Sequence, residues 1–542
     1  MSLVEPGALP ISGEVQFWRM EPEEWEPALR AVQEIGIDTV ATYLSWRRHE
    51  PVQGTLDLRG THAPELDVHR FLRLCRERGL RVILKPGPWI CAEEPNGGLP
   101  DWVVADDALI ALDHRGEQVS GYNPPFKHPM PSCSSRAYRA LVERWIRAVW
   151  SDLAEFLGED GPVVGTQYDN EPSLGFQDSM HGFDWHPDAL ADWHRFIGGT
   201  VEPPRPRTGP PESATALESA WAHWHRVYFA DYLAWLREVT ADAGAAVLAG
   251  TINLNTHPVR GWPQDGRVLV EALEGTVVGE DHYYVPPLDD RDLAGLALAV
   301  AQARASATPL VWSPEMQAGI WRSPGEVVDY PDPTVEEQVA WWGAALALGY
   351  QGFNLYMLVD RENWEHAPIT RSGVVTPLGR ALQRMLRELR GVRIRPGSRP
   401  LPATALEWDD LARVDAYRVR GTQSAPDTAW DSPAARRRYD AVERQSLEAV
   451  RAGRQFDLGG TASGVAIEAP AGFLVRAHED AQGAVLLYVV RLPGAAVRGP
   501  VELGVPLAWR AVRRADAQVR CESGRVVLPA AADVFEIWSV EA

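Results

Sequence analysis

The first part of the chain, up to about residue 390, alternates short apolar runs with amphipathic stretches of helical period. Eight of the apolar runs are predicted as β-strands: 13–18, 39–46, 81–87, 163–171, 247–254, 276–283, 309–316 and 352–360. Each is mostly apolar along its length, which is typical of a strand covered on both faces of its sheet. Strands that alternate with helices in this way indicate βα units around a parallel sheet.

Seven of the amphipathic stretches are predicted as helices: 22–36, 66–79, 135–158, 219–244, 291–305, 334–349 and 376–391. In the first of them, Trp25, Leu29 and Val32 recur at spacings of four and three residues and share one helix face. Eight strands with helices between them predict an α/β fold, a (β/α)8 TIM barrel. A doubly wound open sheet is the structural alternative.

Long insertions follow two of the predicted strands. Residues 88–134 follow the third strand, and residues 172–213 follow the fourth. Both are rich in proline, glycine and polar groups, and both lie on the carboxyl side of the predicted barrel. TIM barrels build their functional sites on that side.

The composition changes in the segment RIRPGSRPLP, residues 393–402, which is predicted to separate two domains. The interpretation is a catalytic barrel over 1–392 and a smaller, mostly-β C-terminal domain over 393–542. The second domain contains one helical stretch, about 433–453. Its strand candidates are 465–469, 472–480, 484–492, 501–507 and 534–540.

Charge and composition exclude several classes of partner. The 74 acidic against 53 basic residues give a net charge of −21, which argues against a nucleic acid or an anionic membrane as a partner. No apolar run is long enough for a membrane-spanning helix, and the N-terminus lacks the pattern of a signal peptide. The four scattered cysteines do not favour structural zinc, and they fit a reduced, cytoplasmic setting. A homo-oligomer is compatible with the sequence.

Two predicted strands end in a glutamate. The fourth ends in Asp169-Asn170-Glu171, and the seventh ends in Ser313-Pro314-Glu315. Hydrolysis of an acetal through a covalent intermediate needs two carboxyl groups about 5 Å apart, and it needs no metal or cofactor. The ends of the fourth and seventh strands face each other across an eight-stranded barrel, so Glu171 and Glu315 can straddle one sugar. The alternative is that both merely cap their strands.

Long segments of the chain resemble one family of glycosidases. The segments ISGEVQFWRM, TYLSWRRHEP, GLRVILKPGPWICAEEPNGGLPDW, GPVVGTQYDNEPS, VWSPEM, GFNLYM and HAPITRSGVVTPLGRALQRM occur in order between about residues 11 and 390. They are similar to glycoside hydrolase family 35, the β-galactosidases of clan A. The segment GPWICAEEPNGGLPDW, residues 87–102, is the most specific of them.

The resemblance implies a retaining, exo-acting β-glycosidase that removes terminal β-D-galactose from a small carbohydrate without a cofactor. It implies Glu171 as acid/base and Glu315 as nucleophile. It also implies a set of sugar-binding residues, in which Asn170 binds the 2-hydroxyl: Tyr43, Cys91, Ala92, Glu93, Asn170, Tyr283 and Trp364. For Tyr43 the alternative is an aromatic ring packed inside the barrel, and for Glu93 it is a solvated acidic loop.

The chain departs from the family pattern near the predicted sugar pocket. Gln317 stands where the family commonly has tyrosine, and NWEHAP, residues 363–368, replaces a tyrosine-rich stretch. Residues 359–362, Val-Asp-Arg-Glu, replace a run of glycine, threonine and asparagine. The sugar is therefore the least determined part of the resemblance.

The same departures bring in acidic residues, namely Asp360, Glu362 and Glu365, in addition to Glu93. Together they suggest an exo-β-glucosaminidase, in which carboxylates meet a sugar ammonium group. The alternative is that these acids form salt bridges with Arg361 and Arg371.

The predicted sixth strand ends in Asp281-His282-Tyr283-Tyr284. Either His282 or Tyr283 can hydrogen-bond the nucleophile, and the strand register decides which of the two points inward. Three further functions stay open: a transglycosidase, a non-catalytic sugar-binding barrel, and a metal-dependent hydrolase. The last would need clustered histidine ligands, which the early strands lack.

Overall fold

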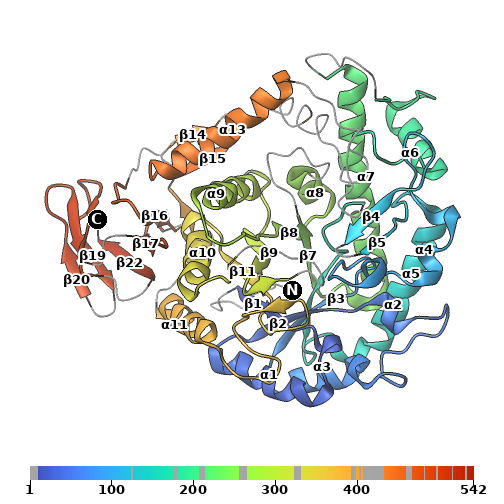
Figure 1. Ribbon diagram of the computed structural model, residues 1–542, viewed down its shortest axis with the longest axis horizontal. Helices are drawn as coiled ribbons and strands as arrows, with labels where there is room; N and C mark the ends of the chain where they lie inside the picture. Colours follow the sequence, from blue (N-terminus) through green and yellow to red (C-terminus); the bar gives the residue numbers. More distant parts are fainter. Residues whose placement is uncertain are drawn as a thin grey trace.

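A computed structural model gives the fold of the chain (Figure 1). The described residues are 10–541 without 124–125, 175–179, 207–213, 256–264, 323–330, 392–397, 402–403, 407–413, 415–432, 459–466, 481, 496–498, 515–516 and 531–533.

Eight parallel strands form a barrel at the centre of the molecule. They are β1 (Ile11–Glu14), β2 (Thr39–Tyr43), β3 (Arg81–Lys85), β6 (Val163–Gln167), β7 (Ala249–Leu254), β8 (Val277–Glu280), β9 (Trp312–Gln317) and β11 (Gly352–Tyr356). Neighbours follow the order β8-β7-β6-β3-β2-β1-β11-β9. A parallel bridge between His282 and Met316 joins the two end strands. The predicted TIM barrel is confirmed, and the open doubly wound sheet is wrong.

All seven predicted helices are present around the barrel. They are α1 (Pro22–Ile35), α3 (Val68–Glu77), α5 (Arg136–Asp152), α7 (Ala216–Thr240), α9 (Asp290–Ala305), α10 (Val335–Leu348) and α11 (Pro377–Gly391). The sequence interpretation missed α8 (Gly266–Ala272), between β7 and β8. Seven residues make barely two turns, so α8 shows too little of the helical period to be detected.

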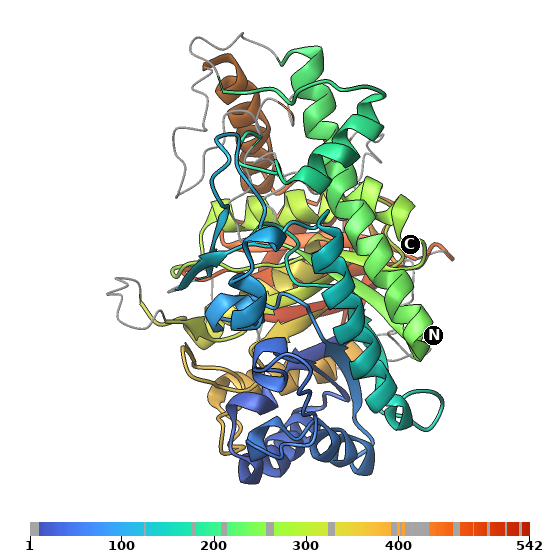
Figure 2. The ribbon, with the colours of Figure 1, turned by 90° about the vertical axis from the view of Figure 1, so that its right-hand side faces the viewer.

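The insertions after β3 and β6 contain structure of their own. The first holds α4 (Asp101–Val104) and an antiparallel hairpin of β4 (Ser120–Asn123) and β5 (Phe126–Pro129). The second holds α6 (Pro187–Ile197). Figure 2 shows the long helix α7, which packs against α5 and α6 on the outside of the barrel.

Most of the tryptophans belong to the core. Ten of them are among the largest fully buried side chains: Trp18, Trp25, Trp46, Trp145, Trp150, Trp193, Trp221, Trp341, Trp342 and Trp538. Their number therefore mainly reflects packing, and it is weak evidence for a sugar site.

The C-terminal region is rich in β-structure, as predicted. Its main sheet has the order β13-β16-β17-β22-β19-β20, and a separate pair joins β18 to β21. The bounds are β13 (Arg399–Pro400), β16 (Phe473–Glu479), β17 (Val485–Arg491), β18 (Val501–Gly504), β19 (Ala511–Arg514), β20 (Ala517–Arg520), β21 (Arg525–Leu528) and β22 (Phe535–Glu541). The sequence interpretation missed β19, β20 and β21, which are short and carry many charged side chains.

Two further elements connect this region to the barrel. The predicted helix is α13 (Pro433–Arg451), which packs against α9. The strands β14 (Thr404–Leu406) and β15 (Phe456–Leu458) form a parallel pair beside it. The predicted division between residues 392 and 393 falls in a segment outside the described residues, and it stays a prediction.

Helix α10 lies between the barrel and the C-terminal sheet. Its sequence is apolar on almost every side, which is typical of a helix that is covered all round. Gly343 allows close approach, because a Cβ placed there would come within 2.8 Å of the Phe535 ring on β22. The sheet and the barrel thus share one continuous core.

No helix among the described residues is long and apolar enough to cross a membrane.

Replacing Phe535 by alanine should lower the free energy of unfolding by roughly 3–5 kcal/mol, since the ring is buried where the sheet meets α10. Urea denaturation followed by tryptophan fluorescence measures the change. Val527→Ala is the control, because Val527 lies on β21 with 51% of its surface exposed. Equal losses for the two variants would contradict the shared core.

Candidate active site

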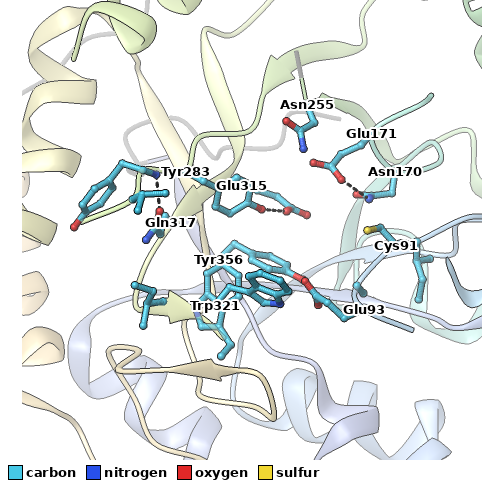
Figure 3. Close-up of a pocket in the computed structure, with 16 residues that line it drawn as sticks. Cys91, Glu93, Asn170, Glu171, Asn255, Tyr283, Glu315, Gln317, Trp321 and Tyr356 are labelled. Carbon is cyan, nitrogen blue, oxygen red and sulfur yellow. Dashed lines mark hydrogen bonds between the residues drawn. The ribbon is translucent and has the colours of Figure 1, made fainter. Parts of the chain in front are cut away.

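A cavity of about 280 Å³ opens at the carboxyl ends of the barrel strands (Figure 3). Its volume is near the lower end of the ~300–1,000 Å³ range of ligand pockets. It is lined by Ile90, Cys91, Ala92, Glu93, Asn170, Glu171, Asn255, Tyr283, Tyr284, Val285, Glu315, Gln317, Ile320, Trp321, Tyr356 and Trp364. The lining includes both predicted catalytic glutamates and every predicted sugar-binding residue except Tyr43.

Glu171 reaches the cavity through a sharp turn at the end of β6. Asp169 and Glu171 both have positive φ angles, 60° and 39°, which non-glycine residues rarely adopt. The Glu171 amide donates to Asn253 Oδ1 (3.0 Å), and the Trp89 amide donates to Asp169 Oδ1 (3.1 Å). The turn is therefore held from two sides, as a strained backbone at a functional site must be.

The environment of Glu171 favours its neutral form. Burial and the nearby charge of Glu315 raise the pKa of Glu171 to about 8. Hydrogen bonds with the side chains of Asn255 and Asp281 lower this pKa without offsetting the burial. At neutral pH, Glu171 is a carboxylic acid with a proton to give.

Glu315 sits at the end of β9 and is surrounded by donors. The Tyr43 hydroxyl donates to its Oε1 (2.6 Å), and the Tyr283 hydroxyl donates to its Oε2. The ammonium of Lys85 lies 3.7 Å from Oε1. Burial raises the pKa of Glu315, whereas the Lys85 charge and the two hydroxyls favour its ionised form. The pKa of both glutamates is raised, but Glu315 is the one that faces an ammonium group and two hydroxyl donors, which suits a nucleophile.

A buried ion pair lies beneath Glu315. Lys85 Nζ is 2.9 Å from Glu14 Oε2, and both side chains are almost completely buried. The ammonium also lies 4.4 Å from the centre of the Tyr43 ring. The sequence interpretation missed both residues, although a charged residue at the end of an apolar strand was the available signal.

The structure resolves the choice between His282 and Tyr283. Tyr283 points into the cavity and binds Glu315, as Figure 3 shows. His282 points away, with Nε2 lying 2.5 Å from the Tyr350 hydroxyl. The backbone amide of His282 donates to the carbonyl of Glu315 (2.7 Å), so the same residue closes the barrel.

Tyr43 lies beneath the cavity. Its side chain is 1% exposed, and it joins Glu315 to Asn170 through its hydroxyl. Tyr43 is not among the residues that line the cavity, and its burial fits the alternative of a ring packed inside the barrel. Its place in a sugar subsite stays a prediction.

The loop after β3 presents Cys91, Ala92 and Glu93 in three successive left-handed conformations, with φ of 54°, 49° and 47°. Glu93 forms a salt bridge with the buried Arg361 (2.5 Å). Burial, with the charges of Glu171 and Glu93, raises the pKa of the Cys91 thiol, so the thiol stays neutral.

The other acidic residues of the predicted charged pocket lie elsewhere. Glu362 pairs with Arg19 (2.6 Å), and Asp360 accepts from the Ala367 amide (2.8 Å). Neither they nor the exposed Glu365 lines the cavity. Of the proposed salt bridges only that of Glu93 with Arg361 is present, since Arg371 pairs with Glu24.

Aromatic rings form one wall of the cavity. Strand β10 (Ile320–Trp321) pairs with β12 (Trp364–Glu365), and this two-stranded flap brings Trp321 and Trp364 to the cavity. The Trp364 ring meets the Tyr356 ring edge to face, with centroids 5.1 Å apart. Trp321 and Tyr356 were not predicted, because only the flap and the end of β11 bring them together.

Gln317 and Asn255 complete the lining. The Gln317 side chain accepts from the Tyr284 amide (2.7 Å) and donates to the Gly319 carbonyl (3.1 Å), so it holds two loops. Asn255, beyond the end of β7, lies beside Glu171 in Figure 3. Within the described residues, no group of three or more histidine, cysteine or acidic side chains is placed to hold a metal ion.

The model of glycosyl hydrolases family 35 matches residues 6–118. This N-terminal part of the chain resembles the family. The matched segment includes β1 to β3 and the loop that carries Cys91, Ala92 and Glu93.

Among known proteins, the chain is 35% identical over 164 residues to an exo-β-D-glucosaminidase of Thermococcus kodakarensis, which covers 30% of the chain and 20% of that protein. It is 28% identical over 392 residues to a β-1,2-glucosyltransferase of Ignavibacterium album, and this match covers 66% of the chain and 51% of that protein. It is 32% identical over 162 residues to a β-galactosidase of Felis catus, or 30% of the chain and 21% of that protein. The chain thus matches between about a fifth and a half of the length of these relatives.

The fold is also found in solved structures. A β-galactosidase from Bacillus circulans sp. alkalophilus superposes with a TM-score of 0.68 over 99% of both chains, at 11% sequence identity. At this identity the likeness concerns the fold alone.

Replacing Glu171 by glutamine should stabilise the protein at neutral pH. The unfolded carboxyl loses its proton near 4.5 and the folded one near 8, so wild-type stability falls with rising pH between these values. The advantage of the variant should grow by at most ~1.4 kcal/mol per pH unit in this window and level off above it. Denaturant unfolding of both proteins at a series of pH values measures this difference in the free energy of unfolding.

The control for this variant is Glu23→Gln on the exposed side of α1. An advantage of Glu171→Gln that shrinks between pH 5 and 8 would contradict the raised pKa of Glu171.

Proposed function

We propose that the chain is a retaining, exo-acting β-glycosidase that releases terminal β-D-galactose. One observation carries the proposal: Glu171 and Glu315 meet at one small cavity, the first in surroundings that keep it protonated and the second among donors that favour its anion. Double displacement at an acetal needs this division between two carboxyl groups.

In the first step, Glu315 Oε attacks the anomeric carbon while Glu171 transfers its proton to the glycosidic oxygen. The bond between the anomeric carbon and that oxygen breaks, and the aglycone leaves as a neutral alcohol. In the second step, ionised Glu171 takes a proton from water, the water oxygen attacks the anomeric carbon, and Glu315 leaves as a carboxylate. Two inversions give net retention.

The surrounding residues support both steps. The hydroxyls of Tyr43 and Tyr283 and the Lys85 ammonium hold Glu315 as the anion that attacks and later leaves. Asn170 donates to Glu171 Oε2 (3.3 Å), and it is close enough to reach a sugar 2-hydroxyl in the same cavity. The rings of Trp321, Tyr356 and Trp364 offer apolar faces for the C–H groups of a sugar.

Galactose is proposed from the β-galactosidases among the relatives and from the family as a whole. The second candidate substrate is a β-D-glucosaminide, which the exo-β-D-glucosaminidase relatives favour. The cavity lining also favours it, since among the described residues that line it there are three carboxyl side chains, those of Glu93, Glu171 and Glu315, and no lysine or arginine. Glu93 is already paired with Arg361, which leaves less negative charge for an ammonium group and places this candidate second.

Replacing Glu315 by alanine should reduce hydrolysis of a nitrophenyl β-glycoside on the order of 10³-fold or more, because the nucleophile is lost. Azide should restore turnover and give the glycosyl azide of inverted configuration, which NMR of the product identifies. The control is Glu23→Ala, which removes an exposed carboxylate on α1, away from the cavity lining. Hydrolysis by Glu315→Ala at the wild-type rate would remove Glu315 from the mechanism.

Nitrophenyl β-galactoside should be the best substrate in a panel that includes the β-glucosaminide, β-glucoside, β-fucoside and α-arabinoside. The kcat/KM for each sugar is the measurement. A higher value for the glucosaminide would replace the first candidate by the second. In that case Glu93→Gln should lower activity on the glucosaminide more than on the galactoside, because only the former carries a cation.

A further inference from the structure

A third carboxyl group lies beside Glu171 without lining the cavity. Asp281 is the first residue after β8, and 7% of its surface is exposed. Its amide donates to the Leu254 carbonyl (2.8 Å), which ties it to the end of β7. Asp281 has no part in the two chemical steps, so its burial beside an acid/base residue needs an explanation.

One amide side chain links Asp281 to the acid/base residue. Asn253 Nδ2 donates to Asp281 Oδ2 (2.7 Å) and to Asn170 Oδ1 (2.7 Å). Asn253 Oδ1 accepts from the Glu171 amide (3.0 Å). With both ends engaged, Asn253 fixes the position of Asp281 relative to the backbone of Glu171.

The remaining oxygen of Asp281 lacks a donor. Oδ1 is buried, and no N–H or O–H group of the described residues donates to it. The side chain is nevertheless within hydrogen-bond range of the Glu171 carboxyl. Two carboxylates that meet in this way repel each other, and a proton on one of them converts the contact into a hydrogen bond.

The charges around the site leave no room for a further anion. The charges of Glu315, Glu171 and Lys85 act on Asp281, Glu14 pairs with Lys85, and Lys85 is the positive member of these four. Glu280, the residue before Asp281, is a further buried carboxyl group. The titratable hydroxyls that face the site are those of Tyr43, Tyr283, Tyr350 and Tyr356, and burial raises the pKa of each, so all four stay neutral. Glu93, on the far side of the cavity, is paired with Arg361.

With Asp281 neutral, the four residues Glu14, Lys85, Glu171 and Glu315 together carry one net negative charge at both stages of the proposed cycle. In the free enzyme, Lys85 offsets one of the two anions Glu14 and Glu315, and Glu171 is protonated. In the covalent intermediate, Glu315 is an ester and Glu171 carries the charge instead. An ionised Asp281 would add a second uncompensated buried charge at each stage, at high cost.

We propose that Asp281 is a positioning residue that stays a neutral carboxylic acid throughout the cycle and donates its proton in a hydrogen bond to Glu171 whenever Glu171 is ionised. The role rests on the proposed function of Glu171. The bond stabilises the Glu171 carboxylate, the form that receives a proton from water in the second step. In agreement, burial and the charges of Glu315 and Glu171 raise the pKa of Asp281 well above its usual value.

The test compares two substitutions of similar shape in the full chain. Asp281→Asn keeps a donor and carries no charge, so the basic limb of the pH profile of kcat/KM should stay within about half a pH unit of wild type. Asp281→Leu removes the donor, so the Glu171 pKa rises and the basic limb should move up by about one to two units. The kcat on a dinitrophenyl glycoside, for which the second step limits turnover, should fall about 10- to 100-fold in Asp281→Leu.

The control is Asp38→Asn, at the opposite end of the barrel just before β2, which should leave the profile unchanged. A basic limb of Asp281→Asn that moves to lower pH by a unit or more would overturn the proposal, because it would mean that an anion had been removed. An unmoved limb in a folded Asp281→Leu would also overturn it, since Asp281 would then act only in packing.

A second measurement does not depend on activity. The infrared difference between wild type and Asp281→Asn at pH 7 should show the loss of a carboxylic acid C=O band, and loss of carboxylate bands would overturn the proposal. If Asp281→Leu does not fold, this spectrum and the pH profile of Asp281→Asn still decide whether Asp281 is a neutral acid or an anion. If wild type hydrolyses no aryl β-glycoside, the proposed function fails, while the spectrum still reports the protonation of Asp281.

Discussion

The site depends on one constraint: several carboxyl groups are buried at one end of the barrel, and a single ammonium group, that of Lys85, lies among them. Lys85 stands between Glu14 and Glu315 at 2.9 and 3.7 Å, so its charge is shared between a structural anion and the residue proposed to attack the substrate. Charges in such a place must be paired or neutralised by protonation. Burial is the main cause of the raised pKa of Glu171, and the charge of Glu315 adds to it.

The walls of the cavity are assembled by separate contacts between loops. Arg361, from the loop after β11, pairs with Glu93 from the loop after β3. Arg19 binds both Glu94 and Glu362 and so joins the same two loops to the end of β1. The pairs Arg361–Glu93 and Arg19–Glu94 are largely withdrawn from water, so each contributes more to holding a loop than a surface pair would. The sugar-facing residues thereby gain fixed positions although they lie outside the strands.

The C-terminal sheet has a different role. It covers α10, a helix whose sequence leaves no polar face for water. Strand β9, which carries Glu315, lies on the same side of the barrel as α9 and α10. The sheet therefore supports the helix that packs on this side of the barrel, while the matched family segment contains the strands β1, β2 and β3.

The sequence by itself determined the barrel, its eight strands and the pair of glutamates, because strand periodicity and strand ends are local properties of the chain. It also determined about half of the cavity lining, since residues such as Cys91, Ala92, Glu93 and Asn170 lie in segments with family motifs. Only the tertiary structure decided that Tyr283 and not His282 faces Glu315, that Tyr43 lies below the cavity, and that Glu93 is neutralised by Arg361. Each of these depends on register or on contacts between residues far apart in the chain. For the same reason the contact of Asp281 with Glu171 cannot be read from the sequence: 110 positions separate them, and the neighbouring strands β6, β7 and β8 bring them together.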